Sequence, residues 1–309
     1  MYETMQTALY WKGMEAHVQQ FVRNCLACTK SKHPTVKYGK LPTKTVIIRP
    51  WFEVVIDSIG PYGKNKFRAM TMIDTSTRLV EIQPVDDASS DDAAFVFDRF
   101  WLCRYPRPMR VIYDQGTEFK KEFFELLDSY GIHAVPTTTR NPQANGVIER
   151  LHRVIGDKLR TQTISTKEEW AAFLHDATFA LRATYNTMLK SSPAQATFGR
   201  DMLFDVEHTT NWDEQYQRKV AQVAKNNERE NAKRRSWTYA PKDKVLLRND
   251  AGPQAKMAPL FSGPYEVIAV RTNGTLVLDK GRYMETIHIR RVIPFKSNVG
   301  KTVSRSDNL

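Results

Sequence analysis

Two stretches decide how this chain folds: Val111-Ile-Tyr-Asp114-Gln-Gly-Thr-Glu-Phe and Asn141-Pro-Gln-Ala-Asn145-Gly-Val-Ile-Glu149-Arg. Asp114 stands where an apolar run meets a Gln-Gly turn, so it is predicted to be the last residue of a buried strand. Glu149 lies near the start of a predicted helix, because apolar residues recur around it at the spacing of one helical face. That apolar stripe consists of Ile148, Leu151, Ile155 and Leu159. The two carboxylates therefore come from different local structures.

A third carboxylate, Asp57, ends the apolar run Val54-Val-Ile and is followed by Ser-Ile-Gly-Pro. Carboxylates at strand ends and in an early helical turn can converge on divalent cations. Mg²⁺ prefers such oxygen ligands, held together with substrate phosphates. The three carboxylates therefore indicate two-metal phosphoryl transfer. Asp74 is a rival carboxylate on a neighbouring predicted strand, and we interpret it as a turn residue.

Composition narrows the class of partner. The chain has 309 residues, enough for two or three domains, and its formal net charge of +12 favours a polyanion. Charge alone does not choose between nucleic acid and an anionic membrane. The sequence shows neither the order of a signal peptide nor an apolar run of the roughly 18 residues that cross a bilayer. Three cysteines argue against a disulfide framework and for a reducing compartment. Nucleic acid in the cytosol or nucleus is the favoured partner.

Residues 1–45 form a short basic segment that contains a CxxC pair, Cys25 and Cys28. We expect a helix over residues 4–20. The CxxC spacing is that of half a zinc site, and a complete site needs two further ligands. His17 and His33 are the histidines nearby. Two small, semi-buried thiols without metal are the alternative interpretation.

Residues 46–205 alternate between strand and helix patterns, which predicts a mixed sheet covered by helices. Ser89 or Ser90 is predicted to cap the first helix of this region, with Asp91 and Asp92 in its first turn. Strands are expected at 51–59, 67–74, 79–85, 109–113 and 132–136, and helices at 90–105, 119–130, around Glu149 and at 167–188.

The alternation of strands and helices stops in the C-terminal third of the chain. Residues 206–239 are predicted to be a charged helical linker, with a helix over 212–235, and a connector is favoured over a dedicated DNA-binding helix. Residues 240–296 read as a small five-stranded β-barrel, in which Asn273-Gly274 makes a tight hairpin turn. Its strands are expected at 245–248, 265–271, 275–279, 283–289 and 290–293. Residues 297–309 are expected to be a disordered tail.

In this order and at these distances, the motifs of the chain resemble those of the integrases of the Ty3/gypsy class of long-terminal-repeat retrotransposons. The C-terminal module resembles the GPY/F module of that class. The motifs are Tyr10-Trp-Lys-Gly-Met14, the CxxC pair, Asp57-Ser58, the two stretches that contain Asp114 and Glu149, Ser192-Pro-Ala-Gln-Ala-Thr-Phe-Gly-Arg200, Lys256-Met-Ala-Pro259, Gly263-Pro-Tyr265 and His288-Ile-Arg-Arg291.

The resemblance implies an RNase H-like catalytic core followed by a small SH3-like barrel. Its D,D,E triad would be Asp57, Asp114 and Glu149, which would hold two Mg²⁺ or Mn²⁺ ions. The implied reaction is 3′-end processing of element DNA and its strand transfer into target DNA. The implied partners are both DNAs and further copies of the chain, with no membrane. The implied location is the nucleus, after transit through the cytoplasm.

The family's zinc site also uses a His pair upstream of the Trp-Lys-Gly-Met stretch. We therefore expect this chain to be a polyprotein fragment that begins within the N-terminal zinc-binding domain. Cys25 and Cys28 would bind zinc only if that His pair is present in the full protein.

Seven residues are candidates for contact with DNA: Gln143, Asn145, His152, Arg153, Arg160, Arg290 and Arg291. Basic residues near Glu149 suit contact with the phosphate backbone, which sets register without reading sequence. Ordinary solvated charge remains the alternative, and Asn145 could instead cap its helix. Two other functions stay open. One is a decayed or co-opted copy that binds DNA without catalysis, and the other is an RNase H-type nuclease that uses the same carboxylates.

Overall fold

A five-stranded mixed sheet organises the middle of the chain in the computed structural model, which describes residues 1–43, 45–87, 89–114, 116–137, 146–249 and 258–295. The strand order is β4-β3-β2-β5-β6, in which β2, β3 and β4 are antiparallel neighbours and β5 and β6 continue parallel to β2. The strands are β2 (Glu53–Tyr62), β3 (Phe67–Asp74), β4 (Val80–Val85), β5 (Arg110–Tyr113) and β6 (His133–Pro136). This sheet confirms the mixed α/β class that the sequence predicts.

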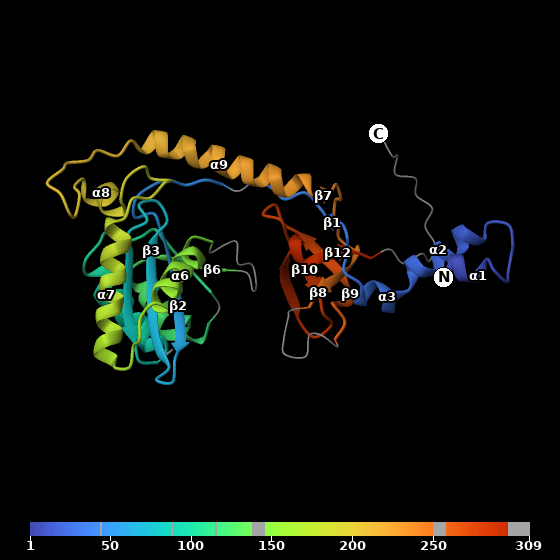
Figure 1. Ribbon diagram of the computed structural model, residues 1–309, viewed down its shortest axis with the longest axis horizontal. Coiled ribbons are helices and arrows are strands. Elements are labelled where there is room, and N and C mark those ends of the chain that lie inside the picture. The colour runs from blue at the N-terminus through green and yellow to red at the C-terminus, as the bar shows by residue number, and fades with distance from the viewer. Residues whose placement is uncertain (44, 88, 115, 138–145, 250–257, 296–309) are drawn as a thin grey trace. The chain divides into compact units, whose positions relative to one another are not determined.

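Helices cover both faces of this sheet (Figure 1). Alternate side chains of each strand point to opposite faces, so each strand serves two cores. One core joins β2 and β3 to α4 and α5, and the other joins them to α6 and α7. The helices are α4 (Ser90–Phe97), continued by a π-helical turn (Asp98–Leu102), then α5 (Lys121–Ser129), α6 (Gly146–Leu159), α7 (Lys167–Ala183) and α8 (Pro193–Phe198).

Both α4 and α8 begin with a side-chain cap. The hydroxyl of Ser89 accepts a hydrogen bond from the backbone N–H of Asp92 at 3.1 Å, which confirms the predicted cap of α4. Ser192 and Gln195 form a reciprocal capping box at the start of α8, inside one of the motifs identified above.

The chain divides into two compact units, Lys44–Lys225 and the combination of Met1–Thr43 with Asn226–Leu309. The division falls inside the long helix α9 (Trp212–Ala232). Residues near both ends of the chain therefore share one unit. A side-chain amide links them directly, because Asn231 accepts a hydrogen bond from the N–H of Leu41 at 2.8 Å and donates one to its carbonyl at 3.1 Å.

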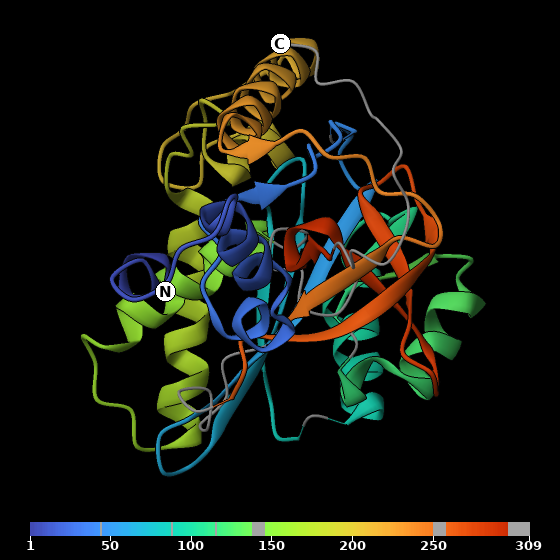
Figure 2. The ribbon, with the colours of Figure 1, turned by 90° about the vertical axis from the view of Figure 1, so that its right-hand side faces the viewer.

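The second sheet belongs to this composite unit and appears in orange and red in Figure 2. Its strand order is β11-β10-β9-β8-β12, and every neighbouring pair is antiparallel. The strands are β8 (Lys244–Arg248), β9 (Phe261–Val270), β10 (Thr275–Asp279), β11 (Met284–His288) and β12 (Val292–Pro294). The five strands predicted for residues 240–296 are thus present. A 3₁₀ turn (Ile289–Arg291) replaces the first half of the predicted last strand.

Several predicted elements differ from the structure in their bounds, and a few short elements were not predicted. The helix expected over residues 4–20 is two helices, α1 (Tyr2–Met5) and α2 (Met14–Asn24), because Gly13 has φ +80° and ends the continuity. A further helix, α3 (Leu26–Ser31), was not predicted. The α7 helix ends five residues before the predicted position 188, at Ala183. Finally, β7 (Arg234–Arg235) lies where no strand was predicted and pairs parallel with β1 (Lys37–Tyr38).

Candidate active site

Asp57 lies in the middle of β2, on the sheet face that α6 covers. Asp57 follows the apolar run Val54-Val-Ile, but β2 continues to Tyr62, past the predicted strand end at 59, because its antiparallel ladder with β3 extends that far. Asp57 shares its face with Val55 and Ile59, which pack in the core formed with α6 and α7. A carboxylate is thus inserted into an otherwise apolar row.

Asp114 follows β5, the strand next to β2, as the sequence predicts. The N–H of Gly116 donates to Asp114 Oδ1 at 3.0 Å and holds the start of the loop. A Cβ on Gly116 would lie 2.4 Å from Glu118 Oε2 and 3.0 Å from Asp114 Oδ1. A side chain at Gly116 would therefore displace the flexible end of Glu118 and crowd the Asp114 carboxylate.

Glu149 is placed by the packing of α6 against the sheet. Ile148, Leu151 and Ile155 are buried on one face of α6, as the spacing predicts, and they anchor the helix in the core. Glu149 itself stays exposed one residue after Ile148. Its carboxylate is therefore held on a fixed helix but open to a ligand.

The pKa of Asp57 reflects the other two predicted carboxylates as well as its burial. Burial, and then the negative charges of Asp114, Glu118 and Glu149, raise the pKa of Asp57 to about 7, although the N–H of Ser58 donates to its carboxylate and opposes the shift. The structure thus places Asp114 and Glu149 near enough for their charges to act on Asp57. It adds Glu118, which sequence reasoning missed although it lies inside the same motif as Asp114.

This donor set fits a hard divalent cation by its chemistry. The groups are carboxylate oxygens on neighbouring elements, and a cation would offset both the burial and the repulsion that raise the pKa of Asp57. Within the described ranges, three or more His, Cys, Asp or Glu side chains do not gather in an arrangement that could hold a metal ion by themselves. Mg²⁺ is typically held by one or two carboxylates together with waters and substrate phosphates, so the two observations agree.

The His152 side chain is 19% exposed and lies beside Asp57 instead of pointing into solvent. Its Nε2 lies 2.8 Å from the hydroxyl of Thr71, and its Nδ1 lies 3.8 Å from Asp57 Oδ2. Burial lowers the pKa of His152 to about 4. This position does not suit a phosphate contact at the surface, which is the role predicted for His152, and favours a role inside the site.

The other DNA contacts predicted near Glu149 differ in their exposure and in their contacts. Arg153 is exposed on α6, one turn beyond Glu149, where a phosphate could reach it. Arg160 is exposed and pairs with Asp157. Gln143 and Asn145 lie outside the described residues.

Arg290 and Arg291 are engaged within their own unit. Arg290 donates from Nε and Nη2 to the two carboxylate oxygens of Glu230, at 2.7 and 2.5 Å. Arg291 donates to the backbone carbonyl of Arg248 at 2.9 Å. Their predicted contact with DNA therefore competes with contacts that the fold already makes.

Cys25 and Cys28 lie together at the start of α3. The backbone N–H of Cys28 donates to the Cys25 sulfur at 3.5 Å, and the hydrogen bonds from Cys28 lower the pKa of the Cys25 thiol. His17 and Cys25 line the same hollow, while His17 Nδ1 already accepts a hydrogen bond from the Trp11 indole at 2.9 Å. Over the described part of the chain, this pair gains no third His, Cys, Asp or Glu ligand.

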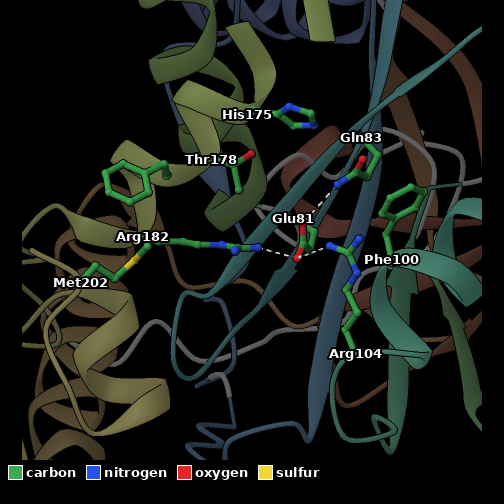
Figure 3. Close-up of a pocket in the computed structure, with 9 residues that line it drawn as sticks. Glu81, Gln83, Phe100, Arg104, His175, Thr178, Arg182 and Met202 are labelled. Atoms are coloured by element: carbon green, nitrogen blue, oxygen red, sulfur yellow. Dashed lines mark hydrogen bonds and ion pairs between the residues drawn. The ribbon is translucent and has the colours of Figure 1, made fainter. Parts of the chain in front are cut away.

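A cavity of about 220 Å³ lies elsewhere in the Lys44–Lys225 unit and contains none of the predicted site residues (Figure 3). Its polar wall is built on Glu81, a buried carboxylate of β4. Arg182 pairs with Glu81 at 2.5 Å and Arg104 at 3.7 Å, and Gln83 donates to it at 3.3 Å. These contacts compensate the buried charge of Glu81. Its place in the cavity wall therefore follows from the fold and does not require a ligand.

Two family models match the chain. Residues 54–142 match the integrase core domain, and residues 1–34 match the integrase zinc binding domain. The first match contains Asp57 and Asp114, and the second contains Cys25 and Cys28.

Curated relatives extend the similarity over more of the chain. The retrovirus-related Pol polyprotein from transposon 412 of Drosophila melanogaster is 28% identical over 93% of this chain, which covers 25% of that protein. Gypsy retrotransposon integrase-like protein 1 of Rattus norvegicus is 27% identical over 64% of this chain, which covers 38% of that protein. The chain thus spans a quarter to two fifths of the length of these relatives. They confirm the resemblance that the motifs predicted.

Solved structures support the fold. The cryo-EM structure of a simian T-cell lymphotropic virus intasome in complex with PP2A regulatory subunit B56 gamma contains a chain that this one matches with a TM-score of 0.60. The match covers 95% of this chain and 98% of that chain at 13% identity. The mixed sheet flanked by helices is therefore consistent with an RNase H-like fold.

Among the described residues, no helix is long and apolar enough to cross a membrane.

Proposed function

We propose that this chain, which is related to the integrases of gypsy-type retrotransposons, is a polynucleotidyl transferase that processes the 3′ ends of element DNA and joins them to target DNA. The observation that supports this proposal is the convergence of Asp114, Glu118 and Glu149 on Asp57, seen in the raised pKa of Asp57. A buried carboxylate near other negative charges is typical of a functional site rather than of a group that only stabilises the fold.

Asp57, Asp114 and Glu149 are the residues proposed to hold divalent cations, Mg²⁺ or Mn²⁺. Two such ions, when bound, would supply stabilisation of the attacking and leaving oxygens of an in-line displacement at phosphorus. The contribution of the protein's own residues is to hold these carboxylates in place. Asp57 is fixed within β2, Glu149 is fixed by the buried face of α6, and Asp114 and Glu149 are exposed where a DNA strand can enter.

DNA is the proposed partner, in line with the net charge of +12. Arg153 is exposed beyond Glu149 and is proposed to contact a backbone phosphate, which would position the strand without reading its sequence. We also propose that several copies of the chain act together on the paired DNA ends, in the nucleus.

Zinc binding at Cys25 and Cys28 is proposed only together with a further pair of ligands. The match of residues 1–34 to the integrase zinc binding domain supports a zinc-related origin of this segment. In the described residues the two thiols are not joined by a third ligand. The second candidate function is a DNA-binding protein derived from an integrase but without catalysis, which the net charge of +12 would suit equally well.

A disintegration assay, the reverse of strand transfer, tests the proposal. The full chain is incubated with Mn²⁺ and a branched oligonucleotide that mimics the strand-transfer product, and resealed DNA is separated on a denaturing gel. Resealing that requires Mn²⁺ is the expected result. DNA binding without resealing would favour the non-catalytic candidate.

An RNA–DNA hybrid in a parallel reaction tests the RNase H-type alternative. The proposal predicts that the hybrid stays intact while the branched DNA is resealed. Cleavage of the hybrid without resealing of the branched DNA would replace the proposal by a nuclease.

A further inference from the structure

The hydroxyl of Thr71 determines which nitrogen of the His152 ring carries the hydrogen. Thr71 Oγ1 donates its single hydrogen to the backbone carbonyl of Asp57 at 2.9 Å, because a carbonyl oxygen can only accept. The same oxygen lies 2.8 Å from His152 Nε2. With its hydrogen already committed, the hydroxyl must accept at this second contact. His152 therefore donates from Nε2.

This assignment leaves His152 Nδ1 directed at the site. Nδ1 is 3.8 Å from Asp57 Oδ2, which is too long for a direct hydrogen bond, and in this tautomer it has no hydrogen to donate. The ring therefore limits the space beside the carboxylate instead of binding it. The His152 and Asp57 side chains are only 19% and 22% exposed. The contact is thus shielded from bulk water.

The fold explains why these three residues meet. Thr71 is the register partner of Asp57 across β2 and β3, so both side chains point to the same face of the sheet. The α6 helix packs on that face through Leu151 and Ile155, and His152 lies one turn after Glu149 on this helix. Thr71 is fully buried, although its neighbours on that face are apolar.

We propose that His152 is a positioning residue for Asp57, held by Thr71 in the orientation that sets the Asp57 carboxylate for a divalent cation. The inference rests on the proposed function, since it assumes that Asp57 is a metal ligand. It differs from that function by assigning roles to two residues that do not themselves bind metal or DNA. Groups that orient metal ligands typically change metal affinity or activity by about 10- to 100-fold when they are removed.

Mn²⁺ binding to the full chain, measured by the loss of the free-ion electron paramagnetic resonance signal, is the first test. Thr71→Val removes the hydroxyl with little change of shape, Thr71→Ser retains it, and His152→Ala removes the ring. We expect Thr71→Val and His152→Ala to weaken Mn²⁺ binding by about tenfold and Thr71→Ser to leave it near the parent value. His175→Gln, an exposed histidine on α7, is the matched control.

The tautomer of His152 is the second test, and it needs neither metal nor activity. Nitrogen-15 chemical shifts of the histidine side chains at neutral pH distinguish a hydrogen on Nε2 from one on Nδ1. The expected result is a single Nε2–H tautomer in the parent chain. His152→Gln, which keeps a donor near the Nε2 position but lacks the ring's Nδ1, should fold like the parent and still bind Mn²⁺ more weakly.

The outcomes separate this inference from the proposed function. A hydrogen on Nδ1 in the parent, or unchanged Mn²⁺ affinity in Thr71→Val and His152→Ala while Asp57→Asn abolishes binding, would overturn the positioning role alone. Asp57-dependent binding that shows the expected variant effects, in a chain that never reseals branched DNA, would overturn the proposed function and keep the positioning role. If the parent shows no Asp57-dependent Mn²⁺ binding, either alone or with the branched oligonucleotide bound, both are wrong.

Discussion

Asp57 and Thr71 are directly opposed residues of the antiparallel ladder between β2 and β3, and the Thr71 hydroxyl donates to the Asp57 carbonyl. Their pairing fixes the face on which the Asp57 carboxylate emerges. A slip of one residue in this register would move Asp57 to the opposite face, away from α6 and Glu149. The geometry of the candidate active site is therefore set by the sheet before any loop contributes.

Replacing Gly116 by alanine should impair the site without unfolding the protein. The added Cβ would fall 2.4 Å from Glu118 Oε2, so the carboxylates around it must move. Displacements of about 1 Å at a reacting centre can lower rates by about 10²-fold. We expect a loss of resealing activity of at least about tenfold with an unchanged melting temperature.

The control for this change is Gly156→Ala on α6, where a Cβ meets nothing within 4 Å. Since alanine favours a helix over glycine by about 1 kcal/mol, this variant should keep its activity and melt slightly higher. Equal activity of Gly116→Ala and the parent would show that the position of Glu118 and Asp114 is unimportant.

Removing Arg182 should destabilise the Lys44–Lys225 unit strongly. Arg182 pairs with Glu81, whose side chain is 2% exposed, and its loss leaves a buried carboxylate poorly compensated. Breaking a buried pair from one side typically costs about 3–5 kcal/mol. Urea unfolding of Arg182→Ala should show a loss in that range.

Arg104→Ala is the comparison on the same carboxylate. The Arg104 side chain is 48% exposed and its nitrogen is 3.7 Å from Glu81, so its loss should cost less than about 1 kcal/mol. Similar effects of the two variants would contradict the view that Arg182 carries the compensation of Glu81.

The pair of Glu230 and Arg290 should make stability depend on pH. The hydrogen bonds from Arg290 lower the pKa of Glu230 below its ordinary value of 4.5. A carboxyl group with a depressed folded-state pKa contributes stability above the unfolded pKa and loses it as pH falls through the folded value. The stability difference between the parent and Glu230→Gln should therefore be full near neutral pH and shrink below about pH 4.5.

Urea unfolding of both chains across this range measures the effect. A stability difference that stays constant down to the most acid conditions would mean that the Glu230 carboxylate is not what Arg290 stabilises. DNA binding by Arg290→Ala, measured at several salt concentrations, is a second test of this pair. Since Arg290 is engaged by Glu230, the slope of the logarithm of the binding constant against the logarithm of the salt concentration should change little. Loss of a true phosphate contact would change that slope by about 1.

Much of the fold could be predicted because its signals are local. The bounds of β3 (Phe67–Asp74) and β10 (Thr275–Asp279) agree with the sequence prediction, since turns flank each run of strand residues. The apolar stripe of α6 correctly predicted its buried face. What failed were properties that depend on distant partners, such as the two-residue ladder between β1 and β7, whose strands are about 200 residues apart in the sequence.

The candidate site was predictable in part for the same reason. Asp57, Asp114 and Glu149 stand out because each interrupts or flanks an apolar pattern. Glu118 does not, and it is revealed by its charge acting on Asp57 and by its approach to Gly116. His152 looked like one of several basic residues on an exposed helix face. Its burial follows from how α6 docks beside Thr71, which helical spacing alone does not show.

The most direct test of the account is the rate of disintegration by three single variants, Asp57→Asn, Asp114→Asn and Glu149→Gln, measured with Mn²⁺ beside the parent chain. Asp157→Asn, a carboxylate two turns further along α6, is the control for charge on that helix. Each of the three should lose at least about 100-fold in rate, since removal of an essential catalytic group typically does so, while the control keeps the parent rate. A parent-like rate in any of the three would contradict the assignment of that carboxylate to the reaction.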